Sequence, residues 1–131
     1  MAEILSVLPT EAARAYLAAR SLMEQHPDLA AERLRKALDL LCLKFGGKDL
    51  SLADKIRDLS ARGHLPAQLQ EAVEALKIVD NVGTRESPAK AASAEAWILD
   101  SLFKLLAEYL YVLPAKTLKM RSVAGESGRT I

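Results

Sequence analysis

The stretch 97–113, WILDSLFKLLAEYLYVL, decides the fold class of this chain. On an ideal helix its apolar side chains span an arc of roughly 220°, far wider than the ~100° that one buried face requires. We therefore expect a helix that packs against neighbours on two sides. Asp100, Lys104 and Glu108 recur at every fourth residue within it. They predict one charged stripe along a soluble helix, because three charges interrupt what would otherwise resemble a membrane span.

Four amphipathic segments before this helix complete the prediction of an all-α fold. Thr10 and Ser51 have hydroxyls that cap helix N-termini, and Asp54 follows Ser51 at the spacing of a capping box. Gly46 and Gly63 supply left-handed stops after two of the helices. We expect helices at about 10–24, 28–45, 51–63 and 66–83, which together with the last one form a compact bundle of about five helices.

Two segments are expected to lie outside regular helices. The stretch 84–93 contains a proline, two serines and several charges, which is typical of a surface loop, and Ser93 would cap the last helix. Pro114 would end that helix, because proline lacks a backbone N–H and clashes with the preceding turn. We therefore predict a helical bundle domain at 1–114 and a flexible, disordered basic tail at 115–131.

Composition limits the classes of function. The formal net charge is +1 over 131 residues, so any nucleic-acid contact must come from a local patch. Cys42 is the single cysteine and is expected to be a buried small hydrophobe. A lone cysteine and an acidic N-terminus without a signal pattern favour the cytoplasm. His26 and His64 have no partners at ligand spacing, so we predict no metal, no cofactor and no catalytic residue.

The polar cluster in 76–85, LKIVDNVGTR, is the candidate functional site. Lys77, Asn81 and Arg85 recur at every fourth residue, so a continuous helix would place them on one face, where they can hold an anion or RNA. Asp80 lies close to the apolar face and is interpreted as a structural polar partner that pairs with Lys77 or Arg85. The alternative is that these charges are solvated residues at a helix end.

Apolar side chains outside the predicted core indicate self-association. Leu40 and Leu43 lie opposite the core stripe of the second helix, and Trp97 shares a side of the last helix with Asp100 and Lys104. These three residues are the interface candidates of a homodimer. The alternative is that the N-terminal segment, a neighbouring helix or the 84–93 loop covers them.

The chain from Leu8 to Leu113 resembles the HEPN superfamily of small helical domains, in the uncharacterised branch found alone or attached to restriction endonucleases. The resemblance depends on the order and spacing of several sequence features, each of which is common in helical proteins. They are Leu8-Pro9, Tyr16, the run AAERLRKALDLLCLKFG at 30–46, Leu52 to Ile56, Gly63 to Pro66, Asn81, and Glu108 to Tyr111.

The resemblance implies a helical domain that often dimerises across a polar cleft. Active members carry an arginine, a nearby polar residue and a later histidine, which together cleave RNA without metal. Here Lys77 replaces the arginine, Asn81 is kept, and Arg85 replaces the histidine. Arginine stays protonated near neutral pH and cannot act as a general base.

The resemblance therefore favours a catalytically degenerate module that binds RNA, a nucleotide or a protein partner in a prokaryotic defence or toxin–antitoxin setting. Two alternatives stay open. One is a metal-independent ribonuclease with a rearranged active site, in which Lys77 and Arg85 stabilise charge on the phosphate. The other is a purely structural dimerisation domain.

Overall fold

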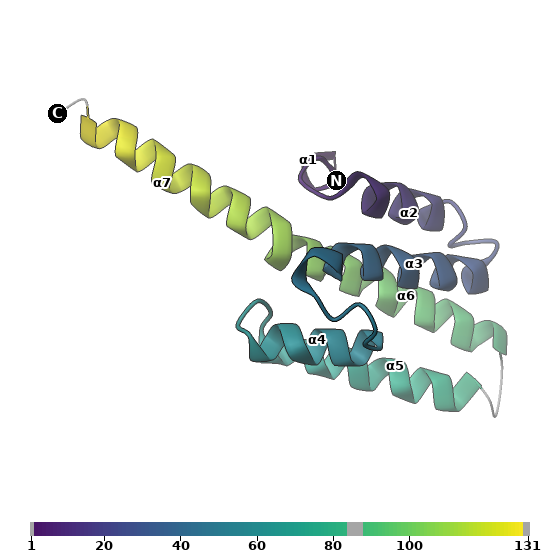
Figure 1. The fold of residues 1–131 in the computed structure, drawn as a ribbon. Coiled ribbons are helices and arrows are strands. Elements are labelled where there is room, and N and C mark those ends of the chain that lie inside the picture. Colours follow the sequence, from purple (N-terminus) through teal and green to yellow (C-terminus); the bar gives the residue numbers. More distant parts are fainter. Residues whose placement is uncertain (1, 84–87, 130–131) are drawn as a thin grey trace.

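The computed structural model describes residues 2–83 and 88–129, and within them the chain forms helices joined by short turns, with no strand (Figure 1). This confirms the predicted all-α bundle of about five helices. In chain order the elements are α1 (Ala2–Ser6), α2 (Thr10–Arg20), α3 (Pro27–Cys42), η1 (Leu43–Phe45), α4 (Leu52–Ala61), η2 (Ala67–Leu69), α5 (Gln70–Gly83), α6 (Pro88–Ala107), η3 (Glu108–Val112) and α7 (Leu113–Arg129).

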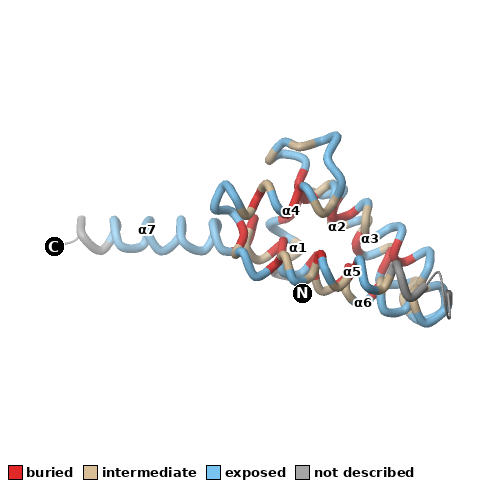
Figure 2. The backbone as a smooth tube through the Cα atoms, turned by 90° about the horizontal axis from the view of Figure 1, so that it is seen from below, coloured by how far each residue is buried: buried red, intermediate tan, exposed pale blue. Residues whose placement is uncertain are grey.

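Helix α6 is the central element of the bundle. It packs against α3 and also against α5, while α2 covers α3. Leu99, Leu102, Phe103 and Leu106 of α6 are fully buried, and Figure 2 shows buried residues along the bundle helices. The wide apolar arc of 97–113 therefore serves two packing contacts, as predicted. Among the described residues, no helix has both the length and the apolarity needed to cross a bilayer.

The local signals for helix ends act as predicted at Ser51, Gly46 and Gly63 but not at Thr10, which lies inside α2, where Pro9 holds the N-cap position without a side-chain cap. The backbone N–H of Asp54 donates to Ser51 Oγ over 3.2 Å, which caps α4. Gly46 and Gly63 have φ values of 91° and 82°, in the left-handed region that favours glycine. These two glycines follow η1 and α4 and end them.

The start of α6 differs from the prediction. The helix begins at Pro88, so Ser93 lies inside it and the expected loop through residue 93 is wrong. Proline suits a first helical turn, where its missing N–H leaves no hydrogen bond unmade. The alanines at 89, 91 and 92 then favour helix over loop. Residues 84–87, which include Arg85, lie outside the described part of the chain.

The C-terminal segment also differs, because the backbone continues past Pro114 as helix α7 instead of the expected irregular tail. The π-helical turn η3 ends at Val112, two residues before Pro114, and its wider geometry accommodates a residue that cannot donate to the preceding turn. The tail is nevertheless separate from the bundle. Residues 113–126 are all exposed, and Figures 1 and 2 show α7 extending away from the other helices.

Candidate anion-binding site

Among Lys77, Asp80, Asn81 and Arg85, Lys77 is the one whose side chain the structure describes. It lies on α5, exposed, with its Nζ 3.5 Å from Oε1 of Glu74 in the preceding turn. Asp80 and Asn81 are part of helix α5, but their side chains are not among those that the structure describes. Arg85 lies wholly outside the described residues. The predicted grouping of Lys77 with Asn81, Asp80 and Arg85 therefore stays a prediction.

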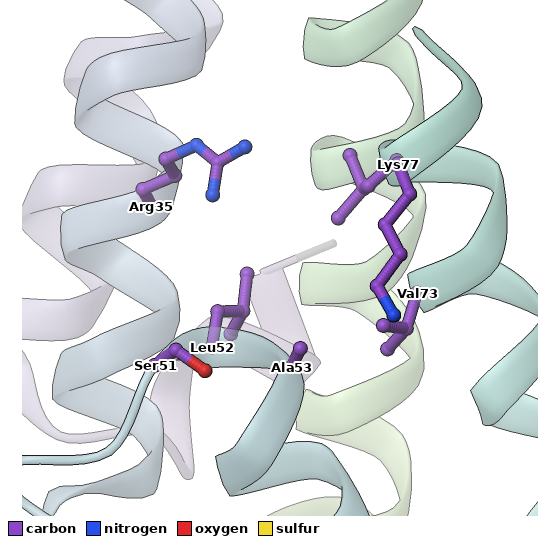
Figure 3. A pocket seen from close by; sticks show the side chains of 7 residues that line it. Arg35, Ser51, Leu52, Ala53, Val73 and Lys77 are labelled. Atoms are coloured by element: carbon purple, nitrogen blue, oxygen red, sulfur yellow. The ribbon is translucent and has the colours of Figure 1, made fainter. Parts of the chain in front are cut away.

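A second cation, Arg35, shares a small pocket with Lys77. The pocket has a volume of about 150 Å³ and lies where α3, the start of α4 and α5 meet. Figure 3 shows Arg35 and Lys77 on opposite sides of it, with Ser51, Leu52 and Ala53 at its base. Val73 and Leu76 complete the lining. Two cationic side chains thus flank a hollow that is lined by the first turn of a helix.

The Arg35 guanidinium is held in place by a carboxylate of α6. Its Nη2 lies 2.8 Å from Oε1 of Glu95, and its Nε donates to the same oxygen over 3.0 Å. The Arg35 side chain is 40% exposed and that of Glu95 only 23%. A guanidinium has five N–H donors, so this contact orients Arg35 while leaving donors for a further acceptor. The Lys77–Glu74 pair, in contrast, is exposed and weak.

The first turn of α4 adds polarity to the base of the pocket. Backbone N–H groups at a helix N-terminus lack intrahelical partners and carry a partial positive charge. Ser51 Oγ satisfies the N–H of Asp54, while Leu52 and Ala53 of the same turn line the pocket. The pocket side chains are arginine, lysine, serine and apolar groups, and none of them is a general base near neutral pH. The site has the chemistry to hold an oxyanion, and the carboxylates nearest to it, Glu95 and Glu74, pair with Arg35 and Lys77 and do not line the pocket.

The structure does not place the three interface candidates next to one another. Trp97 is 67% exposed and Leu43 is 55% exposed, whereas Leu40 is partly buried against the core. Leu43 directly follows α3, whose last turn contacts Tyr111 through the carbonyl oxygen of Leu41. Trp97 lies in α6, two residues after Glu95. At a rise of ~1.5 Å per residue, these regions of α6 and η3 lie roughly 20 Å apart. Leu43 and Trp97 are therefore not neighbours within one copy, and the homodimer interface of Leu40, Leu43 and Trp97 stays a prediction.

A buried polar cluster around Asp100 has no counterpart in the sequence-based prediction. Asp100 is expected on an exposed stripe with Lys104 and Glu108, but it is only 5% exposed, so that expectation is wrong. The Tyr16 hydroxyl donates to its Oδ1 over 2.7 Å, and Arg20 Nη1 and Lys104 Nζ lie 3.4 and 3.1 Å from its Oδ2. These three partners satisfy the buried carboxylate.

Tyr16 and Arg20 stand four residues apart on α2, which lets both reach Asp100. The Tyr16 ring also stacks on Phe103, with ring centroids 4.1 Å apart. Burial, and then the hydrogen bond to Asp100, raise the pKa of the Tyr16 phenol. The cluster joins α2 to α6 and is structural. In the sequence, the Asp100 cluster is indicated only by two four-residue spacings, Tyr16 to Arg20 and Asp100 to Lys104.

Cys42 is buried, as predicted, and burial raises the pKa of its thiol to about 11. The thiol is therefore protonated and unreactive near neutral pH. Within the part of the chain that the structure describes, no group of three or more His, Cys, Asp or Glu residues could hold a metal ion.

Comparison with protein families matches residues 17–123 to the model described as "Domain of unknown function (DUF4145)". No curated protein and no solved structure matches significantly.

Proposed function

Since the chain belongs to the DUF4145 family, whose description specifies no activity, we propose from the geometry that it is a non-catalytic helical module that binds phosphate groups of RNA or a nucleotide. The observation that carries this proposal is the pocket flanked by Arg35 and Lys77. Two cations from different helices face one hollow, and the first turn of α4 lines it.

The chemistry of the two cations suits a phosphate. A guanidinium binds phosphate oxygens through parallel N–H donors, and an ammonium adds a point charge. Glu95 orients Arg35, so little side-chain entropy is lost on binding. The exposed contact of Lys77 with Glu74 is weak enough for a phosphate to displace it.

The resemblance to the HEPN superfamily is a second, independent argument for the same site. Lys77 occupies the position that this resemblance assigns to the arginine of active members. We extend the proposal accordingly: Asn81 and Arg85 continue the binding surface beyond the pocket, the module forms a homodimer, and it works in a prokaryotic defence or toxin–antitoxin setting. Binding is preferred to cleavage in this proposal because the residues that line the pocket include neither a histidine nor a carboxylate.

The direct test is the affinity of the protein for a fluorescein-labelled single-stranded RNA, measured by anisotropy without metal. Arg35→Gln and Lys77→Ala should each weaken binding about tenfold, because each removes a charged contact to phosphate. Arg33→Ala and Lys48→Ala serve as matched controls, since both positions are exposed and outside the pocket. Equal affinity of the wild type and the four variants for the RNA would refute the site.

The same mixtures separate the alternatives. The binding proposal predicts intact RNA on a denaturing gel after long incubation. Cleavage that is lost in Lys77→Ala would establish the rearranged ribonuclease instead. No binding and no cleavage would leave the structural dimerisation domain as the function.

A further inference from the structure

The pocket flanked by Arg35 and Lys77 is too small to enclose a whole nucleotide. Its volume is about 150 Å³, and one molecule of liquid water occupies ~30 Å³, so the hollow has room for roughly five waters. Pockets that enclose a drug-sized ligand measure about 300–1,000 Å³. One phosphate group therefore fits the hollow, while the ribose and the base that carry it stay outside.

The inner side of the pocket is apolar. Val73 and Leu76 are 2% and 6% exposed and belong to the hydrophobic core, and Leu52 packs against the same core. None of these three side chains can form a hydrogen bond with a ligand. A phosphate inside an RNA chain has a ribose on each side, so seating it in the hollow would press ribose hydroxyls against this wall, where they lose water and gain no partner. A phosphate at the end of a chain carries only one ribose and avoids this cost.

Cationic donors reach the pocket from two helices. Arg35 of α3 uses its Nε and Nη2 for one oxygen of Glu95, so its remaining guanidinium N–H groups can bind a ligand. Lys77 of α5 lies opposite, across the hollow (Figure 3). The neighbouring carboxylates of Glu74, Glu95 and Asp54 each contact a cation and do not line the hollow.

The first turn of α4 is a third source of donors. Ser51 is the N-cap of α4 and Leu52 is its first residue, so the helix begins at the base of the pocket (Figure 3). The backbone N–H groups of Leu52 and Ala53 precede the first intrahelical hydrogen bond, which Lys55 donates to the carbonyl oxygen of Ser51. Such N–H groups point out of the helix N-terminus and bind anions.

These three donor groups favour a phosphate with three unesterified oxygens. A terminal phosphate has three such oxygens and a charge of about −1.5 to −2 near pH 7, whereas a phosphate within an RNA chain has two and a charge of about −1. Coulomb attraction grows with the charge of the ligand. A terminal phosphate therefore displaces Glu74 from Lys77 more readily, and it can contact all three donor groups at once.

We propose that this pocket binds a terminal phosphate, the phosphomonoester at the end of an RNA chain or on a nucleotide, in preference to a phosphate within a chain. The inference rests on the proposed function and narrows the ligand of the same site. It predicts that affinity depends on how the phosphate is esterified more than on the number of phosphates in the chain.

The test compares two single-stranded RNAs of one sequence, both labelled with fluorescein at the 3′ end, one with a phosphate and one with a hydroxyl at the 5′ end. Anisotropy should give an affinity at least about tenfold higher for the phosphorylated RNA. AMP should displace this RNA and adenosine should not, because adenosine lacks the phosphate. AMP that binds as tightly as the RNA would identify a nucleotide site and weaker AMP would identify an RNA-end site, and either result supports the terminal phosphate.

A variant that fills the hollow locates the phosphate. Ala53 lines the pocket and is partly exposed, so Ala53→Leu occupies space in the hollow and leaves both cations in place. It should remove the preference for the phosphorylated RNA and bind the hydroxyl RNA like the wild type. Ala61→Leu is the matched control and should keep the preference, since position 61 is exposed on the same helix and outside the pocket. Arg35→Gln and Lys77→Ala should also reduce the preference, so the test does not depend on the folding of one variant.

Failure of the inference and failure of the proposed function give different results. Equal affinity of the wild type for the two RNAs, with losses in Arg35→Gln and Lys77→Ala, would refute the terminal phosphate and leave the proposed function intact. A preference that persists in Ala53→Leu, or displacement by adenosine as strong as by AMP, would also overturn the inference. Affinities for both RNAs that are unchanged in Arg35→Gln and Lys77→Ala would refute the proposed function together with the inference.

Discussion

Asp100 is a buried carboxylate held by three side chains from two helices, and Tyr16 makes its shortest contact, 2.7 Å. Tyr16→Phe keeps the stacking on Phe103 and removes only the donated hydrogen bond. Because hydrogen bonds to charged groups contribute about 1.5–3 kcal/mol, and Asp100 keeps its two cations, we expect the free energy of unfolding to fall by about 1.5 kcal/mol. Urea denaturation measures it, with Tyr109→Phe as the control. An unchanged midpoint would show that the hydroxyl contributes nothing.

Cys42 makes stability depend on alkaline pH. Burial raises the pKa of its thiol from the ordinary 9.0 to about 11, so between these values the unfolded chain has lost a proton that the folded chain keeps. The free energy of unfolding should therefore be constant up to about pH 9 and then fall, with a slope approaching ~1.4 kcal/mol per pH unit from this group. Cys42→Ala should remove the fall between pH 9 and 10 and reduce the slope above pH 10, where the raised pKa values of Tyr16 and Tyr111 still contribute. An identical slope in this variant would contradict the assignment.

Single residues show where prediction from the sequence stops. Lys77 can be chosen as a candidate from the sequence because its spacing to Asn81 and Arg85 is local, and its role stays a prediction. Arg35 is not, because its partner Glu95 is 60 residues away in the chain, and the burial of Asp100 depends on Tyr16, which is 84 residues away. A four-residue period shows which side chains share a face. It does not show which face the fold buries.

At the scale of elements, two glycines have opposite roles and test the helix boundaries. Gly63 has a φ of 82° and open space where a Cβ atom would lie, so only its backbone conformation disfavours another residue. Gly63→Ala should lower the free energy of unfolding by about 1 kcal/mol.

Gly125 lies in α7, also in open space. Gly125→Ala should raise helical ellipticity without lowering the melting temperature. Circular dichroism measures both, and equal effects of the two changes would refute these roles.

The correctly predicted helix ends depend on neighbours in sequence, as at Ser51 with Asp54. The continuation through Pro114 is not predictable in that way, because it follows a π-helical turn whose residues pack against another helix. The Tyr111 hydroxyl of that turn donates to the carbonyl oxygen of Leu41 over 2.7 Å. Such a tertiary contact overrides the local signal of a proline.

At the scale of the whole molecule, Trp97 tests the proposed homodimer. It is the single tryptophan of the chain and is 67% exposed within one copy. If it lies at the interface, dilution should shift its fluorescence emission to longer wavelength as the dimer dissociates, and Trp97→Glu should give the monomer mass in light scattering. A dimer mass for this variant would remove Trp97 from the interface.

The proposed function requires Arg35 and Lys77 to hold one anion together, and a double-mutant cycle measures this coupling. RNA affinity is determined for the wild type, Arg35→Gln, Lys77→Ala and the double variant at one salt concentration. If both cations contact the same phosphate, the losses should be non-additive, with a coupling energy of at least about 0.5 kcal/mol. Losses that add within about 0.3 kcal/mol, or no loss in any variant, would contradict a shared site.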